Sequence, residues 1–252
     1  MQKISIWHKF HILRTKGIIA ALFFYLCLSA MDAQAQKIKT INLPNSDERW
    51  LNYGFLIGGH ISGYKIRYSP AFTDSLMSPI PNMDSVTAIE SKYRPGFSLG
   101  FILNLRLTEY FDLRFLPQVV FYEHEIAYSY AEPSANGSQI LEATQIEFPL
   151  MLKYKSERRG NARMYFIGGI NPSFEAKGKN NQEGGEKLGL KDTNVAVEFG
   201  FGVDIYNQFF KFSPEIRFSK GLTNLAKHDN MYDLGLERVS MNTVTLFLQF
   251  SD

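Results

Sequence analysis

The amino-acid sequence predicts an all-β protein, an eight-stranded antiparallel transmembrane β-barrel with its strands connected as an up-and-down meander. Three observations predict it: segments in which apolar and polar residues alternate strictly, connections that alternate between short and long, and charged or small residues along one strand face. Alternation with a period of two is the pattern of a strand whose two faces meet different surroundings. The 21 Phe and 13 Tyr exclude a disordered chain.

The first part of the chain has the pattern of a secretory signal peptide. Residues 1–16 are basic, residues 17–30 form an apolar run, and Ala33-Gln34-Ala35 is a small-residue cleavage site. The apolar run is shorter than the roughly 20 residues that a membrane-spanning helix needs. Cys27, the single cysteine, lies inside it, so we expect neither a disulfide nor a cysteine-ligated zinc site in the mature chain.

We therefore predict three parts: a signal peptide at 1–35, a periplasmic N-terminal segment at 36–49 and an outer-membrane β-barrel domain at 50–252. The formal net charge of the whole chain is only +2, with 27 basic and 25 acidic residues. This balance gives no basis for a nucleic-acid partner.

Alternation is clearest between Val195 and Tyr206, where Val and Phe occupy one face and small or charged residues the other. Residues 97–107 and 210–219 repeat the pattern. Eight strands are expected near 50–67, 95–107, 110–128, 140–155, 162–174, 194–206, 209–220 and 239–251. Short turns are expected near 108–109, 156–161 and 207–208, and longer polar connections near 68–94, 129–139, 175–193 and 221–238.

A soluble sandwich or lipocalin-like barrel shows the same alternation with its apolar face inward, whereas an outer-membrane barrel turns that face to lipid. The polar face here carries charges of both signs in the middle of strands, which favours the membrane barrel. We interpret these residues as a structural charge network in the lumen: Arg106, Arg114, Glu147, Lys153, Glu198, Asp204, Glu215 and Arg217. Small residues share the face, as a narrow interior requires. Outer-membrane lipid is therefore the expected surrounding.

The chain also ends on an alternating strand, with Phe250 close to its end, which is similar to the C-terminal insertion signal of outer-membrane barrels. Prolines fit the strands less well. Pro117, Pro149 and Pro214 fall inside predicted strands, although proline cannot donate a ladder hydrogen bond and a closed barrel has no free edge. Bulges or a locally loosened seam would accommodate them.

Motifs for chemistry are weak. Residues 96–100 match the G-x-S-x-G nucleophile pattern, but that motif needs a strand-to-helix turn, so Ser98 is interpreted as a small lumen residue. His124, beside Glu123 and Glu125, is the best candidate for rim catalysis, yet solvated rim charge is the favoured interpretation. No metal-ligand spacing is present, and we predict no catalytic, cofactor-binding or metal-ligating residue and no small-molecule substrate.

The densest basic run, residues 153–159, extends from the end of the fourth predicted strand into the turn before the fifth. Charge that solvates the periplasmic rim explains it, and a docking surface for a partner or for anionic headgroups is the functional alternative. In that alternative Arg158 and Arg159 are the candidate partner-docking residues, because guanidinium groups form bidentate pairs with carboxylates.

Three stretches carry a resemblance to a known family: Asp112 to Pro117, the run I-E-F-P-L-M-L-K-Y-K-S at 146–156 with the basic residues after it, and Tyr165 to Gly169. They resemble the PorT family, small outer-membrane barrels of the Bacteroidetes type IX secretion system. The resemblance covers the mature chain in length and layout and is sharpest over 112–170.

This resemblance implies a non-enzymatic role in exporting proteins with a C-terminal secretion signal, such as gliding adhesins and proteases. It implies other type IX components as partners and no catalytic residues. Two alternatives stay open. One is a structural barrel similar to OmpX or OmpA with no secretion role, and the other is a barrel enzyme, for which no convergent Ser/His/acid set is evident.

Overall fold

The computed structural model describes residues 41–70, 86–130, 137–176, 190–227 and 236–252, and all of them belong to one compact unit, Ile41–Asp252. The described strands are β1 (Leu51–Tyr68), β2 (Val86–Lys92), β3 (Arg94–Arg106), β4 (Phe111–Phe115), β5 (Gln118–Tyr130), β6 (Gly137–Glu147), β7 (Leu150–Lys155), β8 (Ala162–Glu175), β9 (Thr193–Tyr206), β10 (Lys211–Gly221) and β11 (Leu236–Ser251). The predicted signal peptide lies outside the described residues, so its boundaries stay a prediction.

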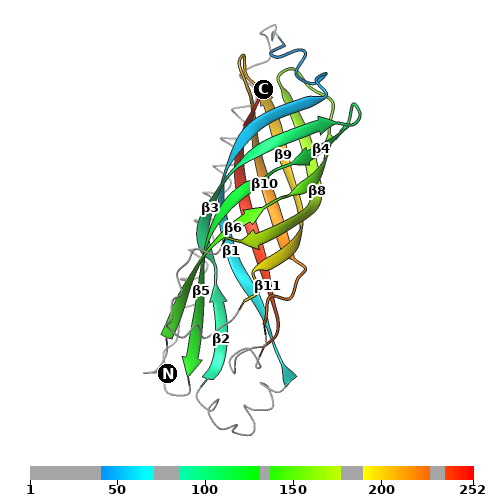
Figure 1. Cartoon of the computed structure of the whole chain (residues 1–252). Helices are drawn as coiled ribbons and strands as arrows, with labels where there is room; N and C mark the ends of the chain where they lie inside the picture. The colour runs from blue at the N-terminus through cyan, green and yellow to red at the C-terminus, as the bar shows by residue number, and fades with distance from the viewer. Residues whose placement is uncertain (1–40, 71–85, 131–136, 177–189, 228–235) are drawn as a thin grey trace, which may run out of the picture. The chain divides into compact units, whose positions relative to one another are not determined.

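Antiparallel pairing joins eight of these strands into a closed ring. The order around the ring is β1, β3, β4, β7, β8, β9, β10 and β11. It is closed by β11 against β1, with Gly54 opposite Ser251 and Arg67 opposite Arg238. Figure 1 shows β11, in red, running beside β1, in blue. The predicted eight-stranded antiparallel meander is confirmed, and each of the eight strands of the ring is paired on both sides.

Three long strands are each interrupted once, so that each is counted as two elements: β2 with β3, β4 with β5, and β6 with β7. The elements therefore outnumber the eight predicted segments. The interruptions lie at Tyr93, at Leu116-Pro117 and at Phe148-Pro149. Pairing runs on in register through the last two. Phe115 is opposite Leu150 before the break, and three residues further along both strands Gln118 is opposite Glu147.

Prolines form a transverse seam across the wall at this level. Leu116 N–H donates to Pro149 O at 3.0 Å, and Phe148 N–H donates to Pro172 O at 3.0 Å. Phe101 N–H likewise donates to Pro117 O at 2.9 Å. In each of the three strand pairs, proline has no N–H to return, so one ladder hydrogen bond is absent where a pair would exchange two. The interruptions at Pro117 and Pro149 therefore follow from missing donors.

Pro214 is accommodated differently, inside β10. On the β11 side its pairing is continuous, with Pro214 opposite Leu248. On the β9 side, pairing lapses at Ser213 and Pro214 and resumes in the same register at Glu215, which is opposite Gly202. At Pro117, Pro149 and Pro214 the register is kept while hydrogen bonds or pairings are lost. Of the two possibilities given above, bulges or a loosened seam, the structure has the loosened seam.

Burial alternates along the strands as predicted. In β9, Ala196, Glu198 and Asp204 are buried, whereas Phe199 and Phe201 are 60% and 48% exposed. The polar and small residues thus face the interior, and the apolar face points outward. A soluble barrel has the opposite arrangement, because its core needs the apolar face.

One predicted connection was drawn too long. Residues 86–92, expected within the connection 68–94, form β2 and pair with the end of β5. Lys92 and Tyr93 are both exposed in succession, so the inward face changes from Ile89 and Ser91 in β2 to Ser98 in β3. A residue added at one point of a ladder reverses the faces beyond it, which hides the strand from a period-two search.

Two apolar clusters lie within the fold. One contains Leu56, Ile102, Leu116, Met151, Tyr165, Ile167 and Phe247. The other packs residues of β2, β5 and β11 with the segment after β10, and contains Ile89, Val120, Tyr122, Ile126, Leu225, Ala226, Leu236, Val239 and Met241. Side chains therefore fill the interior at both levels, and the polar residues described next are packed among them.

Candidate functional site

Arg217 is the centre of one group of buried charges. Its guanidinium donates to Glu215 Oε1 from Nε at 2.9 Å and from Nη2 at 2.5 Å, and to Glu198 Oε2 from Nη1 at 3.2 Å. It also lies 4.3 Å from the centre of the Phe247 ring. Arg217 and Glu215 are adjacent inward positions of β10, and Glu198 is on the neighbouring strand β9. The expected ion pair across these two strands is therefore present.

Glu215 extends this group to the opposite wall. Tyr165 Oη donates to Glu215 Oε2 at 2.8 Å, and Arg114 Nη1 lies 3.4 Å from the same oxygen. Arg114 also donates to Gln249 Oε1 at 2.7 Å and to Asn104 Oδ1 at 3.2 Å. These contacts join strands that lie across the lumen from each other, so the interior is tied together by side chains.

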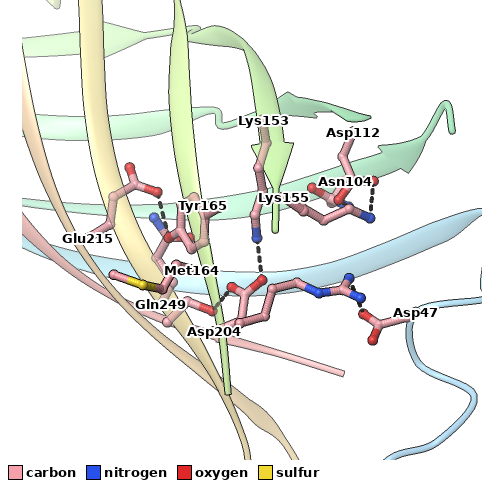
Figure 2. A network of polar contacts seen from close by, with 12 residues as sticks. Asp47, Asn104, Asp112, Lys153, Lys155, Met164, Tyr165, Asp204, Glu215 and Gln249 are labelled. Atoms are coloured by element: carbon pink, nitrogen blue, oxygen red, sulfur yellow. Dashed lines mark hydrogen bonds and ion pairs between the residues drawn. The ribbon is translucent and has the colours of Figure 1, made fainter. Parts of the chain in front are cut away.

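A second group of charges lies around two lysines of β7 (Figure 2). Lys153 Nζ donates to Asp204 Oδ2 at 2.6 Å and lies 3.7 Å from the centre of the Tyr165 ring. Asp204 also accepts from Ser213 Oγ at 2.6 Å. Lys155 Nζ donates to Asp112 Oδ1 at 2.6 Å. Charge-assisted hydrogen bonds of this length are among the stronger polar contacts in proteins.

Glu147 belongs to a third group, directly behind the proline seam. Its carboxylate accepts from Gln118 Nε2 at 2.7 Å, from Tyr122 Oη at 2.8 Å and from Asn171 Nδ2 at 2.7 Å. Gln118 follows Pro117 and Asn171 precedes Pro172, so side chains bond β5, β6 and β8 together where the backbone ladder lacks donors. The polar residues thus compensate for hydrogen bonds that the prolines remove.

Seven of the eight residues predicted for the lumen charge network lie in these three groups. Arg106 is the exception: it is half-buried at the end of β3 and forms no ion pair among the described residues. The sequence reasoning missed Asp112 and Lys155, which have the inward parity of their strands. It also missed the uncharged Asn104, Asn171 and Gln249, which only the strand register brings beside the charges.

The interpretation of His124 as solvated rim charge was wrong. His124 is fully buried, and its ring centre lies 4.2 Å from that of Tyr64. His60 is also buried and lies 4.6 Å from Tyr122. The alternation of β5 continues beyond the expected rim, so His124 points into the interior while Glu125 meets Lys92 and Arg94. Ser98 is a buried lumen residue, as expected.

Residues before β1 fold against the end of the ring where the short turns lie. Asp47 accepts from Tyr206 Oη at 2.7 Å and pairs with Arg163 at 3.2 Å and with Arg158 at 3.5 Å. Arg158 also donates to the carbonyl oxygens of Asn42 and Leu43 and stacks 3.7 Å from the Tyr206 ring centre. The N-terminal segment is therefore held against one side of this mouth, at the β7–β8 turn and the end of β9.

The two arginines proposed for docking consequently differ. Arg158 is occupied by these intramolecular contacts, whereas Arg159 is exposed. An arginine already held by a carboxylate and carbonyl groups has few donors left for a partner. Of the two, only Arg159 is placed to meet another protein.

Comparison with known proteins now identifies the family. The family model described as "Outer membrane protein beta-barrel domain" matches residues 33–227. The chain belongs to this family. No curated protein matches the sequence.

Several solved structures of outer-membrane proteins are similar in fold. OprG from Pseudomonas aeruginosa is 14% identical, with 79% of this chain and 94% of that chain covered and a TM-score of 0.41. Neisserial surface protein A is 12% identical, with 77% and 95% covered and a TM-score of 0.39. AlkL, solved in lipid bilayers, is 11% identical, with 87% and 92% covered and a TM-score of 0.41.

This outer-membrane barrel has the surface that its location requires. Large apolar side chains are exposed on the middle of the wall, among them Phe55, Ile57, Phe97, Leu99, Phe101, Phe166, Phe199 and Phe201. Contact between these side chains and water is unfavourable, whereas contact with the hydrocarbon core of a bilayer is favourable. Among the described residues, no helix is long and apolar enough to cross a membrane.

The interior has little room for anything but its own side chains. A cavity of about 10 Å³, lined in part by His60, Gln118 and Glu147, holds no more than a particle the size of water. Within the described residues, no group of three or more His, Cys, Asp or Glu side chains is arranged to hold a metal ion. The lumen therefore has the character of a packed polar core.

Proposed function

We propose that this outer-membrane barrel is a non-enzymatic and non-conducting accessory component of type IX protein secretion, acting through contacts at its rims. The filled lumen is the observation that carries the non-conducting part. Arg114 reaches across the interior to Glu215, Lys153 reaches Asp204 on a strand that is not its neighbour, and Arg217 pairs with Glu198 on the adjacent strand. Side chains thus fill the eight-stranded barrel. A folded cargo protein cannot pass such an interior, so any export role depends on contact with a larger translocon.

The secretion part of the proposal is supported by the resemblance of residues 112–117 and 146–156 to the PorT family. In the structure these stretches contribute Asp112, Arg114, Glu147, Lys153 and Lys155, together with the break at Pro149. The resembling residues thus specify the interior and the proline seam of the barrel. The secretion role is inferred from this resemblance in sequence.

A structural barrel similar to OmpX or OmpA, with no secretion role, is the competing proposal. The family match supports it more directly, because its description names the outer membrane and the barrel and no secretion system. The two proposals agree on the fold, the location and the absence of a pore. They differ in what happens to secreted proteins when the barrel is removed.

Deletion of the gene in the native bacterium separates the two proposals. We expect proteins with the C-terminal secretion signal to accumulate in the periplasm, while unrelated outer-membrane proteins insert normally. Western blots of periplasmic, outer-membrane and culture fractions measure this, and a plasmid copy of the gene should restore export. Normal release of these proteins from the deletion strain would exclude the secretion role and leave the structural barrel.

Arg159 is the residue with which to test the periplasmic rim as the contact surface. We expect Arg159→Glu to reduce cargo export while the barrel still assembles, and Arg159→Lys to reduce it less. Arg158 is unsuitable for this test, because its substitution would also release the N-terminal segment. Full export with Arg159→Glu would place the contact surface elsewhere without affecting the secretion proposal.

A further inference from the structure

Glu147 is a buried carboxylate without a cationic partner. It is 3% exposed, and its three hydrogen bonds come from the neutral groups of Gln118, Tyr122 and Asn171. No ion pair joins it to a Lys, Arg or His among the described residues. Burying an ionised carboxylate is costly unless a positive charge compensates it, and neutral donors return only part of that cost.

A second carboxylate lies beside it. Asn171 Nδ2, which donates to Glu147 Oε2, also donates to Glu198 Oε1 at 2.8 Å, so both carboxylates contact one amide nitrogen. Glu198 shares Arg217 with Glu215. This part of the lumen therefore holds three carboxylates and two guanidinium groups: Glu147, Glu198, Glu215, Arg114 and Arg217. One negative charge is in excess.

The buried lysines of the described residues are Lys153, Lys155 and Lys211, and none of them forms an ion pair with Glu147. Lys211 lies at the start of β10, opposite Tyr206 and Ser251. Lys153 pairs with Asp204, and Lys155 pairs with Asp112, each at 2.6 Å. Both pairs belong to the group around β7, so the excess negative charge stays local to Glu147 and Glu198. Like charges so close together oppose each other strongly in a low-dielectric interior.

The small cavity adjoins these two carboxylates. Both line it, together with Ser98, Gln118 and His60. Gln118 Oε1, Ser98 Oγ and His60 Nε2 are buried and have no hydrogen-bond partner among the described residues. Each of these side chains is at least nine-tenths buried. Unpartnered buried polar atoms around a cavity need a ligand to bond, and all three of these atoms are able to accept.

We propose that this cavity binds one small monovalent cation, such as Na⁺, through Glu147, Glu198 and the neutral oxygens of Gln118 and Ser98. Carboxylate, amide and hydroxyl oxygens are ligands that hard cations prefer. The excess of one charge selects a monovalent ion, and a cavity of about 10 Å³ has no space for the water shell that Mg²⁺ retains. The cation would also join β3, β5, β6 and β9 next to the proline seam. The proposal is independent of the secretion role.

Thermal unfolding of the purified mature barrel in detergent tests the proposal. Sodium chloride is compared with choline chloride at equal concentration, so that general screening is the same. We expect a higher unfolding temperature in sodium, rising with its concentration, because a ligand that binds only the folded state stabilises it. Glu147→Gln should abolish the difference between the salts. Glu142→Gln, an exposed position on the outward face of the same strand, should preserve it.

Equal unfolding temperatures in the two salts would overturn the proposal. Sensitivity to pH without sensitivity to sodium would do so as well, because a proton on Glu147 would then neutralise the excess charge. Ser98→Ala gives a milder test that leaves every charge in place. It should raise the sodium concentration needed for half of the stabilisation, and an unchanged concentration would contradict the assigned ligands.

Discussion

Replacing Arg217 with alanine tests whether the lumen is packed and dry. Arg217 is 2% exposed and is the charge partner that Glu198 shares with Glu215. In Arg217→Ala, Glu215 retains Arg114 and the hydroxyl of Tyr165. Among the protein's described donors, Glu198 retains the amide of Asn171. The variant therefore leaves Glu198, in addition to Glu147, buried without a Lys or Arg partner.

Breaking a buried ion pair by removing one partner costs about 3–5 kcal/mol. The three hydrogen bonds from Arg217 and its contact with the Phe247 ring place this site in the upper half of that range if the lumen is dry. At about 1.4 kcal/mol for each factor of ten, the equilibrium between folded and unfolded barrel shifts by about three powers of ten.

Urea titration of the purified barrel in detergent measures the effect through heat-modifiable gel mobility. The matched control is Lys220→Ala, because Lys220 is exposed on the same strand and forms no ion pair among the described residues. We expect the control to change the unfolding midpoint little, since exposed charges contribute about 0–1 kcal/mol. Equal shifts for the two variants would show that water screens the lumen charges and would refute this reasoning.

Three further predictions concern the lipid-facing wall, the polar side chains at the proline seam and the N-terminal segment. Phe201→Arg should impair assembly in outer membranes, because a charge at the bilayer midplane costs roughly 2–4 kcal/mol, whereas Phe201→Leu should not; equal membrane recovery would contradict the lipid-facing assignment. Asn171→Leu leaves Glu147 and Glu198 without their shared donor and should lower the free energy of unfolding by about 1–3 kcal/mol, measured as a lower urea midpoint. Asn242→Leu, at a half-buried position of β11, should lower it far less, and similar midpoints for the two variants would show that Asn171 does not bond these strands together. Asp47→Ala should release the N-terminal segment, because Asp47 holds it to Arg158, Arg163 and Tyr206. Proteolysis before residue 50 should then be faster while the barrel stays intact, and an unchanged rate of cleavage would show that these contacts do not hold the segment.

Much of the fold could be predicted because the lipid-facing and lumen-facing residues of a membrane barrel alternate along each strand and differ in polarity. In β9 the apolar and polar faces never exchange, so the segment boundaries and the inward charges follow from parity alone. Where a residue interrupts the parity, as at Tyr93, the prediction failed and β2 was assigned to a connection. Gly202 shows a similar limit: its lack of a side chain leaves room for Tyr165, a neighbour that only the register reveals.

The candidate site was predictable in composition and not in its pairing. Glu198 and Arg217 lie on strands that follow one another, so their contact could be expected from the sequence. Lys153 and Asp204 meet across the lumen, and Asp47 reaches Arg163 from outside the strands. Such contacts depend on strand tilt and register, which period-two alternation does not encode.

Conductance across a planar lipid bilayer tests the central claim most directly, namely that this outer-membrane barrel works without a pore. The purified protein is reconstituted into the bilayer, and heat-modifiable mobility of the recovered sample shows that the barrel is folded. The account predicts no stepwise ion conductance above the protein-free background, because side chains and buried ion pairs fill the lumen. Reproducible open-channel steps from folded protein would contradict it.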